Sequence, residues 1–179
     1  MKNAIIFHGT GETPNHYWYP WLKKELEKRG FSVSIPQLPD TDHPDVKKWL
    51  PVALQEDYSE ETIVIGHSAG STLILALLET VKSPIKQAIL TAAFYENLPE
   101  FSEPIIKPHY DWTTIKKNSN EIIVVNSDND PWGCTPEVGL DLLGKIGGTL
   151  IVPHGEGHMG SDTFNQPMKE FPLLLKFIA

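Results

Sequence analysis

Residues 62–81 read TIVIGHSAGSTLILALLETV: a short apolar run, two glycines around His-Ser-Ala, and a longer apolar stretch. The run from Thr62 to Ile65 is rich in β-branched residues, as expected of a buried strand. Residues 70–81 have the length and composition of a helix. A strand that becomes a helix through Gly66-His67-Ser68-Ala69-Gly70 is typical of a tight turn that raises a serine nucleophile above the sheet. The stretch therefore predicts an α/β protein with Ser68 as its reactive side chain.

Strand-like and helix-like segments alternate on both sides of this turn. The further strands are predicted at residues 4–7, 31–35, 88–91, 122–125 and 149–152. The further helices are predicted at residues 17–29, 46–54, 111–117, 137–143 and 168–178, with the second of them broken at Pro51. This order predicts a mostly parallel six-stranded sheet between two helical layers, a three-layer αβα sandwich. We expect one domain over residues 1–179, because no linker appears and the longest loop, residues 94–110, is too short for a large lid.

Composition and charge limit the classes of function. The chain has 179 residues, of which 40% are hydrophobic, and a formal net charge of −8. Its lysines form pairs such as Lys23-Lys24 but no basic patch, so nucleic-acid binding is not expected. No apolar stretch approaches the length of a membrane span, and Cys134 is the single cysteine. We therefore expect a cytoplasmic protein that has no internal disulfide and does not bind membranes.

A serine nucleophile needs a general base, usually histidine, and a carboxylate that orients the base. In this type of fold the acid and then the base follow the serine along the chain, each in a loop after a later strand. The first such loop is Ser127-Asp128-Asn129-Asp130-Pro131. Either aspartate could serve, and we favour Asp130 because Pro131 fixes the chain beyond it. The other interpretation is a turn in which Asp128 and Asn129 cap local amides.

The candidate base lies in Gly155-Glu156-Gly157-His158-Met159-Gly160, after the last predicted strand. Glycines around His158 let the backbone swing the imidazole toward Ser68. His154 is the competing base, but it is close to the strand end and next to Pro153, so we interpret it as a structural or rim residue.

Two backbone N–H groups are expected to form an oxyanion hole. One is the N–H of Ala69, directly after the nucleophile, and the other is the N–H of Thr10 in His8-Gly9-Thr10-Gly11, the loop after the first strand. A phosphate-binding loop is the alternative for residues 8–11. It is disfavoured because the third glycine of a dinucleotide fingerprint and the lysine of a Walker motif are missing.

The candidate substrate-pocket residues are His8, His67, Phe94 and Trp132. Aromatic residues at helical spacing, such as Trp18 and Trp21, usually belong to the core. No cofactor or metal ion is expected, because two nearby carboxylates without a clear third ligand are weak grounds for a metal site.

Several of these motifs together resemble a known family. They are His8-Gly9-Thr10-Gly11, Trp18 to Leu22, Trp49-Leu50-Pro51, Gly66 to Gly70, Asp111-Trp112 with Ile115, Ser127 to Pro131, and Gly157-His158. The chain is similar to the small, lidless α/β-hydrolases of the retinoblastoma-binding serine hydrolase family. The resemblance implies a catalytic triad of Ser68, Asp130 and His158 and a reduced α/β-hydrolase sheet with strand order 2-1-3-4-5-6. One departure is that Gly133 and Cys134 follow Trp132, where bulkier residues are common in the family.

These features predict hydrolysis of an ester or amide bond in a small acyl substrate, through an acyl-enzyme on Ser68. Two alternatives remain open. One is a protein-interaction module with a vestigial triad, and the other is a thioesterase or acyltransferase that uses the same site. Nothing in the sequence indicates a protein partner.

Overall fold

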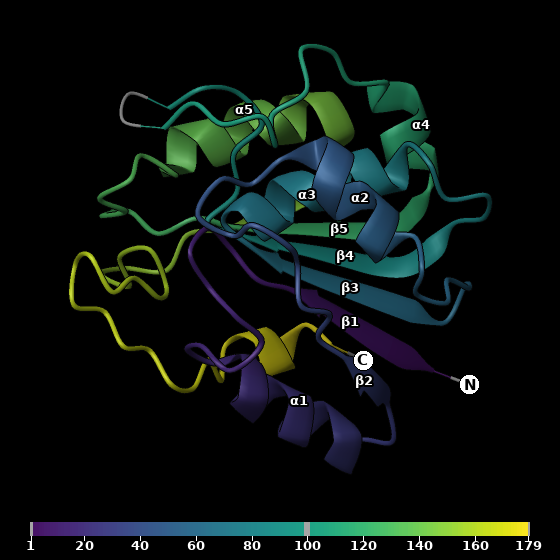
Figure 1. The fold of residues 1–179 in the computed structure, drawn as a ribbon, viewed down its shortest axis with the longest axis horizontal. Coiled ribbons are helices and arrows are strands. Elements are labelled where there is room, and N and C mark those ends of the chain that lie inside the picture. Colours follow the sequence, from purple (N-terminus) through teal and green to yellow (C-terminus); the bar gives the residue numbers. More distant parts are fainter. Residues whose placement is uncertain (1, 99–100, 179) are drawn as a thin grey trace.

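The computed structural model describes residues 2–98 and 101–178 (Figure 1). Its centre is a six-stranded sheet in the order β2-β1-β3-β4-β5-β6, and each strand pairing is parallel. The strands are β1 (Asn3–Phe7), β2 (Ser32–Ser34), β3 (Thr62–His67), β4 (Ile85–Thr91), β5 (Ser119–Val125) and β6 (Thr149–Ile151). The predicted number, order and direction of strands are therefore confirmed.

Helices cover both faces of the sheet. They are α1 (Tyr19–Lys28), α2 (Val46–Ala53), α3 (Ala69–Leu78), α4 (Trp112–Lys117) and α5 (Pro136–Ile146). Figure 1 shows α1 and the yellow C-terminal segment on one face and α2 to α5 on the other, which confirms the three layers. The central strand β3 is buried along its whole length, as parallel strands between two helical layers are. Over the residues described, no helix is long and apolar enough to cross a bilayer.

The predicted break at Pro51 is wrong, because α2 runs through this residue to Ala53. A proline inside a helix removes one backbone hydrogen bond. In this short helix other contacts offset that loss. The Asp45 side chain accepts a hydrogen bond from Lys47 N at 2.8 Å and caps the helix, and Trp49 is fully buried.

The predicted closing helix over residues 168–178 is also wrong. Only a 3₁₀ turn, η1 (Leu174–Lys176), forms there. Pro167 directly precedes this segment and Pro172 lies within it, and neither residue has a backbone N–H to donate to a helix. Arg29 Nη1 instead donates to the carbonyl oxygens of Leu175 and Ile178, at 2.9 and 3.1 Å, and ties the segment to the end of α1.

The fold places one crevice at the carboxyl ends of β1 and β3. These strands are neighbours, yet β1 leads to α1 on one face of the sheet and β3 leads to α3 on the other (Figure 1). Loops that leave adjacent strands in opposite directions open a crevice, which is where ligands bind in parallel α/β sheets. Close packing keeps this crevice tight, since a Cβ on Gly70 would lie 2.7 Å from the His8 carbonyl oxygen.

Candidate active site

Ser68 lies on the turn between β3 and α3 in a conformation that serine rarely adopts. Its φ is 53° and its ψ is −121°. Positive φ costs a non-glycine residue about 1–3 kcal/mol and persists only where surrounding contacts impose it. Here Ser68 N donates to the Thr91 carbonyl at 2.9 Å, and the Ser68 carbonyl accepts from Ser71 N at 2.8 Å. The turn therefore has the strained geometry predicted for a nucleophile at the start of a helix.

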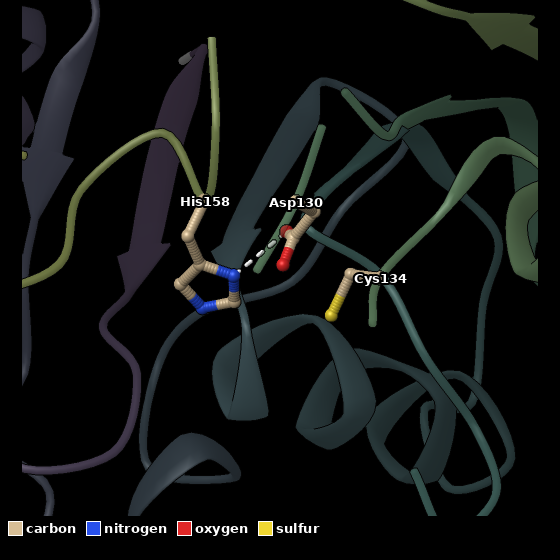
Figure 2. Close-up of side chains that lie close together, drawn as sticks. All are labelled: Asp130, Cys134 and His158. Atoms are coloured by element: carbon tan, nitrogen blue, oxygen red, sulfur yellow. Dashed lines mark hydrogen bonds and ion pairs between the residues drawn. The ribbon is translucent and has the colours of Figure 1, made fainter. Parts of the chain in front are cut away.

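Asp130 and His158 form a buried acid–base pair. His158 Nδ1 lies 2.8 Å from Asp130 Oδ2, and both residues are less than a tenth exposed. The other carboxylate oxygen of Asp130 accepts from Trp132 N at 2.8 Å, which fixes the carboxylate plane. Figure 2 shows the second ring nitrogen of His158 directed away from Asp130. The pair can therefore hold His158 with its proton on Nδ1 and Nε2 available as a base.

The environment keeps His158 in its neutral form near neutral pH. Burial is the largest influence and lowers the pKa of His158. Asp130 opposes this through its hydrogen bond, and the charge of nearby His67 lowers the pKa further. A general base must be unprotonated to act, so this shift favours the base role.

The loop before Asp130 also holds the loop that carries His158. Glu156 N donates to Ser127 Oγ at 3.1 Å, Gly155 N donates to Asp128 Oδ1 at 2.9 Å, and Gly157 N donates to Asn129 Oδ1 at 2.7 Å. The sequence predicts that the side chains of Asp128 and Asn129 accept from backbone N–H groups, but of their own turn and not of residues 155–157. No sequence pattern indicated that the partners lie almost thirty residues further along the chain.

Asp128 and His154, the competing acid and base, pair with each other away from the pocket. His154 Nδ1 lies 2.6 Å from Asp128 Oδ2, and the His154 side chain is 95% exposed. This surface pair does not line the pocket beside Ser68.

A cavity of about 300 Å³ opens beside Ser68 and His158. Its apolar wall consists of Phe94, Leu98, Phe101, Trp132 and Cys134, and its other side of Thr10, Gly11, Glu12, Tyr17 and residues 160–163. Two of the predicted pocket residues, Phe94 and Trp132, line this cavity, and their contact with substrate stays a prediction.

The prediction of His8 and His67 as pocket residues is wrong. Both are fully buried behind the cavity wall. His8 Nε2 accepts a hydrogen bond from Leu38 N at 3.1 Å, so its ring serves the loop after β2. His67 lies between Glu12 and the carbonyl oxygen of His158. Glu12 was not among the predicted site residues. The available signal was a carboxylate four residues after His8, in a loop expected to bind the substrate.

The residues of the two expected oxyanion donors lie close to Ser68, one next to it in the chain and one at the same cavity. Ala69 is the first residue of α3, and Thr10 lines the cavity. The intervening Gly9 is pressed against the nucleophile, since a Cβ there would lie 3.1 Å from Ser68 Cβ. Thr10 Oγ1 is buried and has no hydrogen-bond partner within the described part of the chain. The assignment of the two N–H groups to an oxyanion remains a prediction.

Asp130, Cys134 and His158 also form a cluster that could be considered for a metal ion, because one ligand atom from each lies within 4.8 Å of the others (Figure 2). However, the atoms that would have to bind the metal ion already have another role. Both carboxylate oxygens of Asp130 accept hydrogen bonds. Burial, followed by the charge of Asp130, raises the pKa of the Cys134 thiol and disfavours the thiolate that a metal requires. The cluster therefore fits an acid–base pair with a neutral thiol beside it better than a metal centre.

Comparison with known proteins agrees with this geometry. Residues 4–176 match the family model described as serine hydrolase. The chain belongs to the serine hydrolase family. It is 32% identical over 152 residues to the serine hydrolase RBBP9 of Rattus norvegicus, covering 78% of each protein. It is 28% identical over 171 residues to the putative hydrolase YdeN of Bacillus subtilis, covering 90% of this chain and 87% of YdeN.

Solved structures support the fold of this serine hydrolase. The crystal structure of the B. subtilis ydeN product superposes with a TM-score of 0.91 at 24% identity, covering 99% of this chain and 96% of that one. Est1E from Butyrivibrio proteoclasticus, solved with ferulic acid, gives a TM-score of 0.69 at 15% identity, covering 98% and 89%. The resemblance to small α/β-hydrolases is thus confirmed by family and by fold, and the chain is a serine hydrolase.

Proposed function

We propose that this serine hydrolase cleaves an ester or amide bond of a small acyl substrate, with Ser68 as nucleophile, His158 as general base and Asp130 as the orienting carboxylate. The observation that carries the proposal is the buried hydrogen bond of 2.8 Å between His158 Nδ1 and Asp130 Oδ2, at the cavity that Ser68 also lines. This pairing leaves His158 Nε2 as the available base.

In the first half of the reaction, His158 Nε2 takes the hydroxyl proton of Ser68 while Oγ attacks the carbonyl carbon of the substrate. The negative charge moves to the carbonyl oxygen, where the N–H groups of Ala69 and Thr10 would stabilise it. Collapse of this intermediate breaks the bond to the leaving group, which receives the proton from His158 Nε2. The acyl group is then esterified to Ser68 Oγ.

In the second half, His158 takes a proton from water, and the resulting nucleophile attacks the acyl-enzyme. Collapse releases the carboxylic acid and returns the proton to Ser68 Oγ. Asp130 stays ionised throughout and stabilises the imidazolium form of His158.

The cavity favours acyl groups of modest size. Its volume of about 300 Å³ lies at the lower end of the range of ligand pockets, and its apolar wall includes Phe94, Phe101 and Trp132. We place the acyl chain against this wall and the more polar leaving group on the side of residues 160–163. A cytoplasmic setting is part of the proposal.

The first prediction concerns Ser68. A fluorophosphonate should label the wild-type protein at Ser68, and Ser68→Ala should abolish both labelling and the hydrolysis of short p-nitrophenyl esters. Asp130→Asn should still fold but lose about 10³–10⁴-fold in kcat, because His158 would be held in the wrong tautomer. Mass spectrometry of the labelled peptide and steady-state assays measure these effects.

Three outcomes would point elsewhere. A wild-type protein that does not label would indicate an interaction module with an inactive triad. Preferential transfer of the acyl group to added alcohols or amines would indicate an acyltransferase. Wild-type rates in Ser68→Ala would exclude Ser68 as the nucleophile.

A further inference from the structure

Beside the nucleophile lies a buried carboxylate–imidazole pair that the reaction steps above do not use; its carboxylate, Glu12, is at the cavity wall and its imidazole, His67, lies behind that wall. Glu12, from the loop after β1, places Oε1 3.1 Å from Nδ1 of His67, the last residue of β3. Tyr19 of α1 donates its hydroxyl proton to Glu12 Oε2. The Glu12 and His67 side chains are 7% and 0% exposed.

The contacts of this pair limit where its shared proton can lie. Tyr19 donates its hydroxyl proton to Glu12 Oε2, and the Tyr19 oxygen lies 2.8 Å from His67 Nδ1. His67 Nε2 lies 2.8 Å from the carbonyl oxygen of His158, which can only accept, so Nε2 carries a proton. The shared proton then lies between Glu12 Oε1 and His67 Nδ1. On Nδ1 it gives an ion pair, and on Oε1 it gives a neutral pair with the same contacts.

The electrostatics favour the shared proton on His67 Nδ1, which is the ion pair. Burial alone would raise the pKa of Glu12, but the charge and hydrogen bonds of His67, Tyr19 and Gly9 outweigh burial and lower it. Burial alone would lower the pKa of His67, but the charge and hydrogen bond of Glu12, together with the His158 carbonyl and the charge of Asp130, outweigh burial and raise it. His8 provides the contrast: its ring contacts the backbone groups Gly9 O and Leu38 N, and burial lowers its pKa.

The ion pair joins the three chain segments that make up the active site. Glu12 Oε2 accepts from Gly9 N at 2.5 Å in the loop that carries Thr10. His67 directly precedes Ser68 in the turn between β3 and α3. Through its Nε2, His67 holds the carbonyl oxygen of His158, the proposed base. A buried ion pair contributes little net stability compared with apolar packing, so its value lies in what it positions.

The pair also acts on His158 through its charge. The rings of His67 and His158 lie 5.0 Å apart between centroids. The charge of His67 lowers the pKa of His158, and the more weakly acting charge of Glu12 raises it. The titratable groups that face the two imidazoles come from several elements. Glu12, Tyr17 and Tyr19 lie on the His67 side, and Asp130 and Cys134 lie on the His158 side. His8 and His16 belong to the segment after β1.

We propose that Glu12 and His67 are positioning residues of this active site: an internal ion pair that fixes the loop of residues 8–11 and the loop of residues 155–160 against the turn that carries Ser68, and that places its charges beside His158. This inference rests on the proposed roles of Ser68 and His158. It assigns no contact with substrate to His67. It explains why an imidazole occupies the position before the nucleophile although it does not reach the cavity.

The test is the pH dependence of Glu12→Gln, which keeps the size of Glu12 and one acceptor oxygen, replaces the other oxygen by an NH2 donor, and removes the charge. Without the carboxylate, burial leaves His67 neutral, so both charges are lost. Of their two opposing influences on the pKa of His158, the lowering by His67 is the larger, so its loss decides the direction. We expect kcat to fall about 10- to 100-fold through misplacement of reacting groups, with KM changed by less than about twofold. The acid limb of kcat/KM, which reports the base of the free enzyme, should move to higher pH.

A matched control is His154→Gln, which removes the histidine of the surface pair with Asp128 from the same loop as His158. It should leave both kcat and the acid limb unchanged. A folded Glu12→Gln protein with the wild-type acid limb would overturn the proposal, even if its activity were reduced, because Glu12 would then have a structural role only.

A measurement on the wild-type protein is independent of both folding of the variant and activity. In ¹⁵N-histidine spectra near pH 7.5, the His67 signals, assigned by their loss in His67→Gln, should show both ring nitrogens protonated. A neutral His67 would overturn the proposal. Failure of fluorophosphonate labelling in wild type would instead count against the proposed function, which separates the two.

Discussion

Ser68 and Thr10 line the same cavity, but they differ in their hydrogen bonds. Ser68 is held at a positive φ by backbone hydrogen bonds from both sides of its turn. Thr10 is the unusual residue, because its hydroxyl is buried and has no hydrogen-bond partner in the described chain. An unpaired buried hydroxyl costs about 1–3 kcal/mol. A substrate that accepts a hydrogen bond at this position would relieve that cost on binding or in the transition state.

At this scale we predict the effect of Thr10→Val, which keeps the shape of the side chain and removes the hydroxyl. The free energy of unfolding should stay the same or increase by up to about 1 kcal/mol, because an unsatisfied group is removed. The value of kcat/KM should fall about tenfold, because the hydroxyl finds its partner in the reacting complex. Chemical denaturation and ester hydrolysis measure the two effects.

Thr10→Ser provides the control, since it keeps the hydroxyl and loses only a methyl group. It should retain most of the wild-type kcat/KM. Full activity in Thr10→Val would show that the hydroxyl has no role toward substrate.

The contact between β1 and α3 decides how closely the elements of the site approach one another. Gly70, in the first turn of α3, lies against the end of β1, where a Cβ would overlap the Phe7 carbonyl oxygen. Gly66, before the turn that carries Ser68, has equally little space for a side chain, since a Cβ there would lie 2.6 Å from Ser71 N. The obstacles are backbone atoms, which cannot move aside as a flexible side chain could.

At the scale of elements we therefore predict that Gly70→Ala destabilises the protein by about 1–3 kcal/mol or more, because overpacking forces α3 away from β1. Activity should fall as well, since Ser68 moves with the helix. Urea denaturation and ester hydrolysis would measure both.

Gly144→Ala in α5 is the matched substitution, because a Cβ there meets no atom within 4 Å. It should stabilise the protein by about 0.5–1 kcal/mol through helix propensity. If the two variants had equal stability, close packing at Gly70 would not be limiting.

On the scale of the whole molecule, the C-terminal segment completes the layer formed by α1. Phe171 is 3% exposed and lies edge-to-face against Trp18, with 5.7 Å between ring centroids. Trp18 in turn donates from Nε1 to the Met159 carbonyl at 2.8 Å, next to His158. Packing of the chain terminus is thereby linked to the loop that carries the proposed base.

We predict that Phe171→Ala lowers the free energy of unfolding by about 3–5 kcal/mol, as expected for a large buried aromatic side chain. Phe164→Ala, at a phenylalanine that is 45% exposed, should cost less than about 1 kcal/mol. Thermal or chemical denaturation compares the two variants. Equal losses would mean that the C-terminal segment contributes no more to the core than a surface loop.

Local sequence signals were sufficient for the sheet and for the chemistry of its loops. Continuous β-branched runs such as Thr62 to Ile65 predict buried parallel strands, because such strands meet apolar layers on both faces. The pattern around Ser68, and the order in which Asp130 and His158 follow it, predicted which residues would meet at the end of the sheet. These predictions depend on periodicity and chain order, both of which can be read along the sequence.

Only the tertiary structure decided the features that depend on contacts between distant residues. The helix expected over residues 168–178 is absent, because Arg29 and the prolines impose another conformation. His67 was expected in the pocket, but it lies behind it, and the carboxylate that pairs with it is 55 residues away at Glu12. The sequence alone determined the sheet and its order, and it predicted the roles proposed for Ser68, Asp130 and His158, through local pattern and chain order. The structure determined the burial and pairing of charges, because these depend on which side chains meet in space.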